Sequence, residues 1–149
     1  MNQLLLIVTI AGNRVALRAS EVEAVVELEA LIPVPRAALH IAGLSALRSR
    51  VLTVIDCKRS LELGETLRGE GPQEAVVVDH DGHHYALGVD LVEDVVDSIG
   101  QPSALRGALA PGWERVGLGL VETAGGPLLL VDIAALIAGP EQRSVSVAA

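Results

Sequence analysis

Aromatic and sulfur-containing residues are almost absent from this chain of 149 residues, which has no Phe, one Trp, one Tyr, one Cys and one Met. Half of the residues are hydrophobic, so the chain is expected to fold around a core of Val, Leu, Ile and Ala. The single cysteine, Cys57, excludes a disulfide framework and a zinc site built from several cysteines. We expect Cys57 to be a small buried residue in a reducing compartment.

Positive charge and long apolar runs are also scarce. The chain has 11 Lys and Arg against 19 Asp and Glu, which gives a net charge of −8. Nucleic acids and anionic membrane surfaces require a basic face, so neither is an expected partner. The apolar run at 4–10 is too short for a membrane span and lacks the basic flank of a signal peptide. The sequence therefore predicts a cytoplasmic protein without membrane insertion, with one domain at 1–140 and a flexible tail at 141–149.

Two stretches of the chain repeat each other. Residues 12–27 and 82–97 align without a gap at a spacing of 70 residues and are identical at seven of sixteen positions. An apolar run and a turn lead into each copy, as in a β-hairpin. A second repeat relates 50–63 to 126–139, where a short β run ends in Asp56 or Asp132 and a short apolar-periodic stretch follows. Each aspartate is expected to be the N-cap of a short helix.

Each half of the chain therefore contains five expected strands and a short helix after the fifth, a number of strands that suits a small barrel. The predicted fold class is all-β, with two five-stranded barrel subdomains at about 1–68 and 73–140 and a Gly-rich junction at 63–73. The segments 30–38 and 98–112 contain prolines, which cannot donate ladder hydrogen bonds, and are expected to be loops.

One histidine cluster raises the question of a metal site. His80, His83 and His84 lie at the turn of an expected hairpin. Adjacent strand residues such as His83 and His84 point to opposite faces, so a solvated polar tip is favoured over a tetrahedral metal site. No catalytic nucleophile motif or phosphate-binding loop is present in the sequence. Two hypotheses remain: a protein-binding scaffold without enzymatic activity, metal or cofactor, and a small β-barrel that binds a ligand or metal through the 80–84 hairpin.

The ordered motifs between residues 4 and 138 resemble the CheW family of chemotaxis coupling proteins. The first half resembles "EV", "I-x-P-x-P", "G-[VI]-x-x-L-R-G" and "V-[IV]-D" through Val22, Pro33, Gly43, Leu47, Arg48, Val54, Ile55 and Asp56. The second half resembles "G-[LI]-x-V-D-x-V-x-x-V" through Gly88, Val89, Asp90, Val92 and Val95. The resemblance implies two SH3-like barrels with a shared core and no catalysis. It also implies an adaptor that joins the cytoplasmic tip of chemoreceptors (methyl-accepting chemotaxis proteins) to the regulatory domain of the histidine kinase CheA.

The resemblance also implies where such partners bind. Arg48 occupies the position of the family's motif arginine, which can lay its stem on apolar neighbours and offer its guanidinium to a partner's carboxylate. The alternative is an ordinary surface arginine with little energetic effect. The other candidates for partner contact lie close to the same motifs: Val22, Val25, Gly43, Leu44 and Leu47.

Three residues depart from the family pattern. Ser49 replaces a glycine, Thr53 replaces a proline, and Ala24 stands where an acidic residue is frequent. Strand alternation is expected to turn the neighbouring Glu23 to the opposite face, which predicts that Arg48 has no carboxylate partner from this segment. Arg50 is expected on the other face of its strand, as an ordinary surface residue.

Overall fold

The computed structural model describes residues 3–28, 30–64, 73–104 and 109–140 and contains two β-sheets. The first half forms β1 (Leu4–Ile10), β2 (Asn13–Arg18), the 3-10 turn η1 (Ala19–Glu21), β3 (Val22–Leu28), β4 (Ile41–Leu47), β5 (Arg50–Asp56) and α1 (Cys57–Ser60). The second half forms β6 (Gln73–His80), β7 (His83–Gly88), β8 (Leu91–Asp97), β9 (Ile99–Ser103), α2 (Pro111–Val116), β10 (Gly117–Thr123), β11 (Gly126–Val131) and α3 (Ile133–Ala138). The predicted all-β fold class is confirmed. No helix among these elements is long and apolar enough to cross a membrane.

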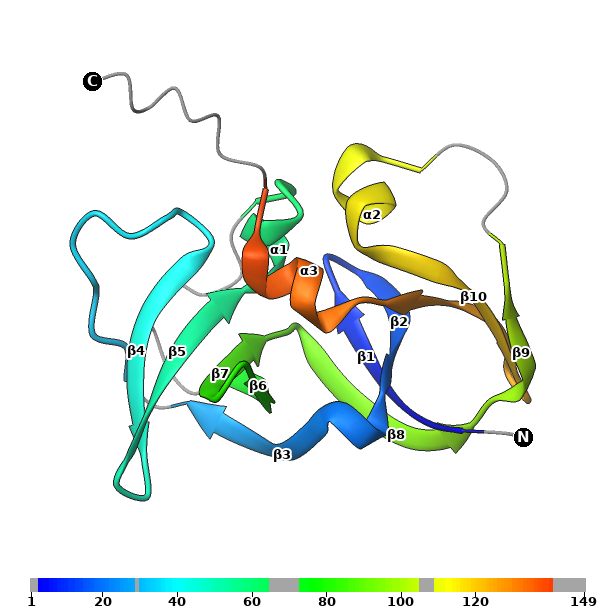
Figure 1. Ribbon diagram of the computed structural model, residues 1–149, viewed down its shortest axis with the longest axis horizontal. Coiled ribbons are helices and arrows are strands. Elements are labelled where there is room, and N and C mark those ends of the chain that lie inside the picture. Colours follow the sequence, from blue (N-terminus) through cyan, green and yellow to red (C-terminus); the bar gives the residue numbers. More distant parts are fainter. Residues whose placement is uncertain (1–2, 29, 65–72, 105–108, 141–149) are drawn as a thin grey trace.

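Each sheet combines strands from both halves of the chain (Figure 1). One sheet has the order β3-β6-β7-β5-β4 and the other has the order β8-β1-β2-β11-β10-β9. Hairpin β1–β2 of the first half lies among second-half strands, where β2 pairs in parallel with β11. Hairpin β6–β7 of the second half lies among first-half strands, where β7 pairs in parallel with β5. The two hairpins are thus exchanged between the halves. The expectation that each half forms a barrel by itself is wrong. The short turn η1 after β2 sends β3 into the neighbouring sheet instead of back along β2.

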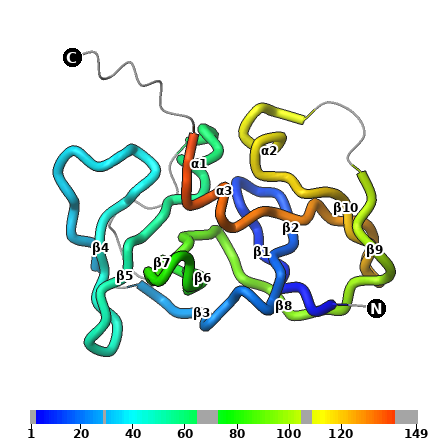
Figure 2. The backbone as a smooth tube through the Cα atoms, viewed as in Figure 1, coloured from blue at the N-terminus to red at the C-terminus, as the bar shows by residue number. Residues whose placement is uncertain are grey.

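Both sheets close into small barrels, as the backbone trace in Figure 2 shows. Strands β8 and β9 form the two edges of the six-stranded sheet and are separated by one residue, Ser98, so a single bent segment closes this barrel. In the other sheet, Ile32 follows β3 and exchanges two backbone hydrogen bonds of 2.9 Å with Leu44 of the opposite edge strand. Each barrel is therefore five-stranded if the bent β8–β9 segment is counted once.

The segment 98–112 differs from the loop expected there, because it contains β9 and the start of α2. Pro102 is compatible with β9 because this strand lies at the edge of its sheet, where a missing N–H donor breaks no ladder. Pro111 stands at the first helical position of α2, where its N–H would have no intrahelical acceptor. Proline therefore does not by itself distinguish a loop from an edge strand or the first turn of a helix in this segment.

Aliphatic side chains fill three buried clusters in the described part of the chain. One lies inside the barrel formed by the five-stranded sheet and another inside the barrel formed by the six-stranded sheet. The largest lies between the barrels and receives residues from β1, β2, β5, β6, β7, β11 and all three α-helices. It includes Trp113, and it matches the shared core that the family resemblance implies.

The helices gather where the barrels meet (Figure 1). Asp56 Oδ1 accepts hydrogen bonds from the backbone N–H groups of Lys58 and Arg59 at 3.1 and 3.2 Å, and Asp132 Oδ1 accepts one from Ala134 at 3.0 Å. The two predicted N-caps are therefore confirmed. Since Asp56 is only 2% exposed, its cap is made inside the protein.

Arg115 of α2 links all three α-helices. Its guanidinium donates to the carbonyl oxygen of Ala135 at 2.6 Å, to that of Ser60 at 2.7 Å and to Ser60 Oγ at 3.1 Å. Ser60 Oγ in turn donates to the carbonyl oxygen of Leu136 at 2.8 Å. Desolvation lowers the pKa of Arg115, and the nearby charge of Glu62 opposes this effect. Arg115 is therefore a structural residue that satisfies carbonyl groups at two helix ends.

We expect Arg115→Met to lower the free energy of unfolding by about 2 kcal/mol, because the carbonyl groups of Ser60 and Ala135 lose their charged donor. Urea denaturation would measure the loss. Arg18→Met is the matched control. Within the described residues the Arg18 side chain forms a partly exposed ion pair with Glu21 at 3.7 Å and no other polar contact, so the change should alter stability by less than about 0.5 kcal/mol. Equal losses in the two variants would contradict the structural role of Arg115.

We also expect Asp56→Ala to cost about 1 kcal/mol of stability, because the first turn of α1 loses the acceptor of two N–H groups. Asp132→Ala should cost less, since Asp132 accepts one hydrogen bond and is more exposed. Thermal unfolding of both variants would check the order. A larger loss for Asp132→Ala would show that capping does not dominate the contribution of these residues.

Candidate functional site

The tip of the β4–β5 hairpin is a two-residue turn formed by Arg48 and Ser49. Leu47 pairs with Arg50 across the turn, and the φ angles of Arg48 and Ser49 are 49° and 74°. Two-residue turns with both φ angles positive favour Gly, Asn or Asp, because other side chains crowd the backbone there. This tip therefore holds two unfavourable residues in a left-handed conformation.

The equivalent hairpin of the second half lacks these features. Thr123 pairs with Gly126 across the β10–β11 turn, which is formed by Ala124 and Gly125. These residues stand 76 positions after Leu47, Arg50, Arg48 and Ser49, the spacing that also relates Asp56 to Asp132. The charge and the backbone strain of the tip therefore belong to one copy of the repeated hairpin only.

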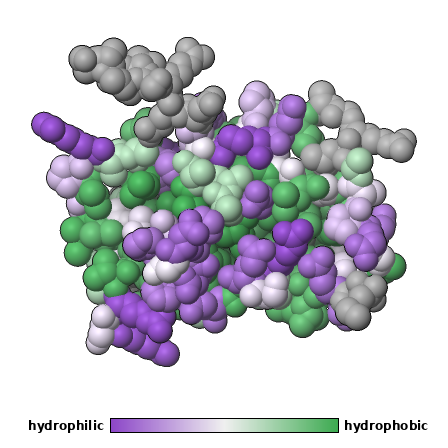
Figure 3. Space-filling view, in the orientation of Figure 1, coloured by the Kyte–Doolittle hydropathy of each residue, from purple (hydrophilic) through white to green (hydrophobic). Residues whose placement is uncertain are grey.

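A cleft of about 330 Å³ opens beside this tip, between β3 and the β4–β5 hairpin. Buried Leu52 and Val77 form its floor, and charged side chains stand at its rim. A second cleft of about 210 Å³ lies between the end of β3 and β4 and shares Leu47 with the first. Figure 3 shows hydrophobic surface next to the strongly hydrophilic hairpin tip at the lower left. The residues around the first cleft are Glu23, Ala24, Leu47, Arg48, Arg50, Leu52 and Val77.

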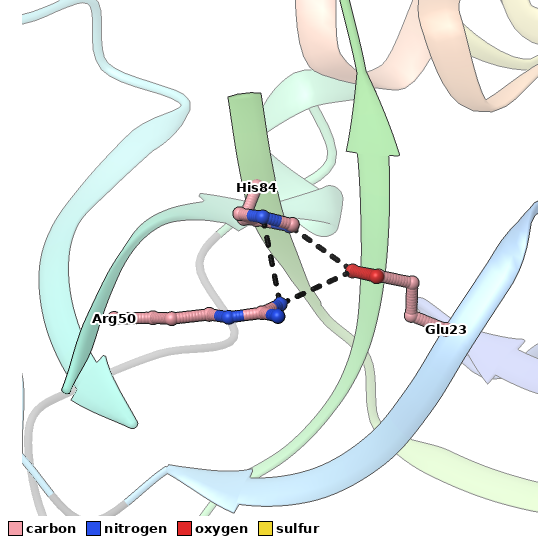
Figure 4. A network of polar contacts seen from close by, with 3 residues as sticks. All are labelled: Glu23, Arg50 and His84. Carbon is pink, nitrogen blue, oxygen red and sulfur yellow. Dashed lines mark hydrogen bonds and ion pairs between the residues drawn. The ribbon is translucent and has the colours of Figure 1, made fainter. Parts of the chain in front are cut away.

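Glu23, Arg50 and His84 form a polar network at this rim (Figure 4). Glu23 Oε1 lies 3.8 Å from Arg50 Nη1 and 3.0 Å from His84 Nδ1, and His84 Nε2 lies 3.5 Å from Arg50 Nη1. A neutral His84 that donates from Nδ1 to Glu23 keeps Nε2 as an acceptor for Arg50. The network thus joins β3 and β5 of the first half to β7 of the second.

The orientation expected for Glu23 is wrong, and a β-bulge is the reason. Val22 pairs with Val78 and Ala24 with Val77, so Glu23 is an extra residue on β3. A bulge interrupts alternation, and Glu23 therefore lines the same cleft as Ala24. The expectation that Arg50 is an ordinary surface residue on the other face is also wrong, because Arg50 lines the same cleft as Arg48 and contacts Glu23 and His84.

Arg48 is exposed at the rim of the same cleft. Among the residues that the structure describes, none forms a hydrogen bond or ion pair with its guanidinium. The predicted lack of a carboxylate partner from the 22–24 segment is thus confirmed, although for a different reason. Ala24 has no carboxylate, while Glu23 is near but directed to Arg50 and His84.

The other candidate residues occupy varied positions. Leu47 is half-buried and lines both clefts, Val25 is 44% exposed, and Val22 and Leu44 are half-buried. Gly43 is buried with a φ of 150°, and an added Cβ would lie 2.5 Å from the carbonyl oxygen of Ile32. Gly43 therefore permits the bridge that closes the barrel. The structure brings Leu47 and Arg48 together in one cleft, whereas the other four do not line either cleft.

The histidines considered for metal binding and the single cysteine do not form a reactive or metal-binding site within the described residues. His83 is exposed at the start of β7, while His84 contacts Glu23. The described residues hold no group of three or more His, Cys, Asp or Glu side chains that could bind a metal ion. Cys57 is completely buried, as predicted. Desolvation, followed by the charges of Asp56 and Asp90, raises the pKa of the Cys57 thiol, so it stays protonated at neutral pH.

The alignment of residues 12–27 with 82–97 contains a sequence signal for the network of Glu23, Arg50 and His84. Glu23 aligns with Glu93 and His84 with Arg14 at the 70-residue spacing. Glu93 lies at the equivalent bulge of β8, and its Oε2 is 2.9 Å from Arg14 Nε. An acid and a base that recur at corresponding positions could therefore have indicated that Glu23 contacts His84.

The fold and the cleft define a class of protein: a double β-barrel module with interleaved halves and a charged, apolar-floored cleft on one barrel. The CheW-like domain model matches residues 4–141, so the chain belongs to the CheW-like domain family. The crystal structure of the scaffolding protein TtCheW from Thermoanaerobacter tengcongensis is similar, with a TM-score of 0.75 and 20% sequence identity over 91% of this chain and 88% of that chain. This likeness concerns the fold. A search of curated proteins found no match.

Ser49→Gly should raise the free energy of unfolding by about 0.5–1 kcal/mol, because glycine adopts a positive φ without the steric penalty of a Cβ. Chemical denaturation would measure the gain. Ser20→Gly is the control, since Ser20 is exposed and its φ is not positive. That change should be slightly destabilising, so a similar effect of both variants would argue against strain at the tip.

Proposed function

We propose that this protein is a non-catalytic cytoplasmic adaptor that couples chemoreceptors to the histidine kinase CheA. Membership of the CheW-like domain family supports this class of function. The structural observation that carries the proposal is Arg48, an exposed cation on a strained turn beside an apolar cleft floor. The proposed partners are the receptor's cytoplasmic tip and the kinase's regulatory domain.

The backbone of the tip favours a binding role over an ordinary surface role for Arg48. Residues in sparsely populated backbone conformations cost free energy and cluster at functional sites. The equivalent β10–β11 turn contains glycine and no charge, so the fold itself does not require the charged and strained form. Arginine next to apolar side chains is also typical of the residues that dominate protein interfaces.

An adaptor needs a second surface for its second partner. The barrel formed by the six-stranded sheet exposes large apolar side chains on β1, β8, β9 and β10, which suit the apolar centre of an interface. Assignment of one partner to each barrel is part of this proposal. The exposed residues are Leu4, Leu91, Val95, Ile99 and Leu118.

Arg48→Ala should weaken binding of a partner by roughly 1–3 kcal/mol, the range for loss of one charge-assisted contact, and should leave stability within about 0.5 kcal/mol of the wild type. Isothermal titration calorimetry with a soluble receptor-tip fragment and with the CheA regulatory domain would measure both affinities. Arg18→Ala, outside the cleft, should bind like the wild type. If the wild type binds neither probe, the proposed function is wrong, and equal binding by the two variants would remove Arg48 from the interface.

A further inference from the structure

We propose that the cleft beside the β4–β5 tip recognises one carboxylate of a partner protein through Arg48, while Glu23 and His84 withhold Arg50 from that partner. The inference rests on the proposed adaptor function and names the chemistry that the partner must present. It requires an acidic side chain next to an apolar one on the partner's surface.

Arg48 and Arg50 both line the cleft, but they differ in whether their guanidinium groups can bind a partner's carboxylate without breaking an existing contact. Arg48 has no hydrogen bond or ion pair within the described ranges. Arg50 Nη1 lies 3.8 Å from the carboxylate of Glu23 and 3.5 Å from His84 Nε2. A partner's carboxylate would have to displace the Glu23 carboxylate to reach Arg50, whereas Arg48 needs no such exchange. The cleft therefore presents a single usable cation.

The surroundings of Arg48 determine what accompanies the carboxylate. The cleft contains Leu47, Leu52, Val77 and the small side chain of Ala24, so its interior is apolar. An apolar partner side chain can enter this space while the adjacent carboxylate meets the guanidinium at the rim. The chain as a whole carries a net charge of −8, which repels a polyanion at long range. A protein segment with one acidic and one apolar residue fits both conditions.

Arg50 is therefore a second cation of the cleft that could bind the partner's carboxylate only after its ion pair with Glu23 is removed. If the carboxylate of Glu23 is replaced by a neutral amide, Arg50 loses its counter-charge and can turn to the partner. Glu23→Gln should therefore partly compensate for the loss of Arg48. Glu27→Gln is the matched control, because Glu27 is an exposed residue of the same strand that lines the neighbouring cleft instead.

The first experiment measures the affinity for the receptor-tip fragment and for the CheA regulatory domain by calorimetry. Arg48→Ala should weaken binding at least about ten-fold. Glu23→Gln combined with Arg48→Ala should recover a few-fold of this loss, the effect expected from removing an exposed ion pair, and Glu27→Gln combined with Arg48→Ala should not. Equal recovery in both double variants would show that only net charge matters, and no recovery would show that Arg50 does not bind the partner once its ion pair with Glu23 is removed. Either result overturns the inference.

The second experiment needs no partner and so separates this inference from the proposed function. Phenylglyoxal labelling of the isolated protein, followed by peptide mass spectrometry, compares the reactivity of Arg48 and Arg50. Arg48 should react several-fold faster in the wild type, and Glu23→Gln should bring Arg50 close to the rate of Arg48 while Glu27→Gln leaves the difference intact. Equal rates in the wild type would overturn the withheld state of Arg50, whether or not either partner binds.

Discussion

The exchange of hairpins between the two halves is the constraint on which the rest of this structure depends. Hairpin β6–β7 lies in the interior of the sheet formed by β3, β4 and β5, and hairpin β1–β2 lies in the interior of the sheet formed by β8 to β11. Neither half can therefore complete a barrel alone. The largest apolar cluster lies between the barrels, so separating them would expose more core than opening either one. We therefore expect the two barrels to unfold together as one cooperative unit.

The candidate site follows from this exchange. Glu23 and Arg50 come from the first half, but His84 reaches them only because β7 lies parallel to β5, with Tyr85 opposite Thr53. The same strand β5 ends at Asp56, whose side chain caps α1 at the seam of the barrels. One end of β5 is thus fixed in the helical cluster while the other carries the hairpin tip. A rigid strand can in this way present an exposed arginine in a defined position.

Local features of this fold could be predicted from the sequence, whereas strand pairing could not. Asp56 and Asp132 cap helices because capping depends on the residues that follow within one turn. The repeat shows that β1–β2 and β6–β7 are equivalent, but it carries no information on which half each hairpin joins. The orientation of Glu23 was missed because one extra residue on β3 reverses the alternation, and no residue type marks that bulge in the sequence. The availability of Arg48 could be predicted because Ala24 offers no carboxylate whatever its orientation.

Two departures from the family pattern, Ala24 and Ser49, lie at or beside the cleft of Arg48. In the pattern implied by the resemblance, an acidic residue at the position of Ala24 could pair with the motif arginine. In this chain the carboxylate has moved by one residue to Glu23, and its cation is Arg50. Glu23 thus pairs with Arg50, and Arg48 is left without a carboxylate from β3. Ser49 at a φ of 74° strains the turn, but this strain falls on an exposed tip outside all three apolar clusters. The barrels can therefore tolerate this strain while the tip retains a cation whose charge is not neutralised within the described fold.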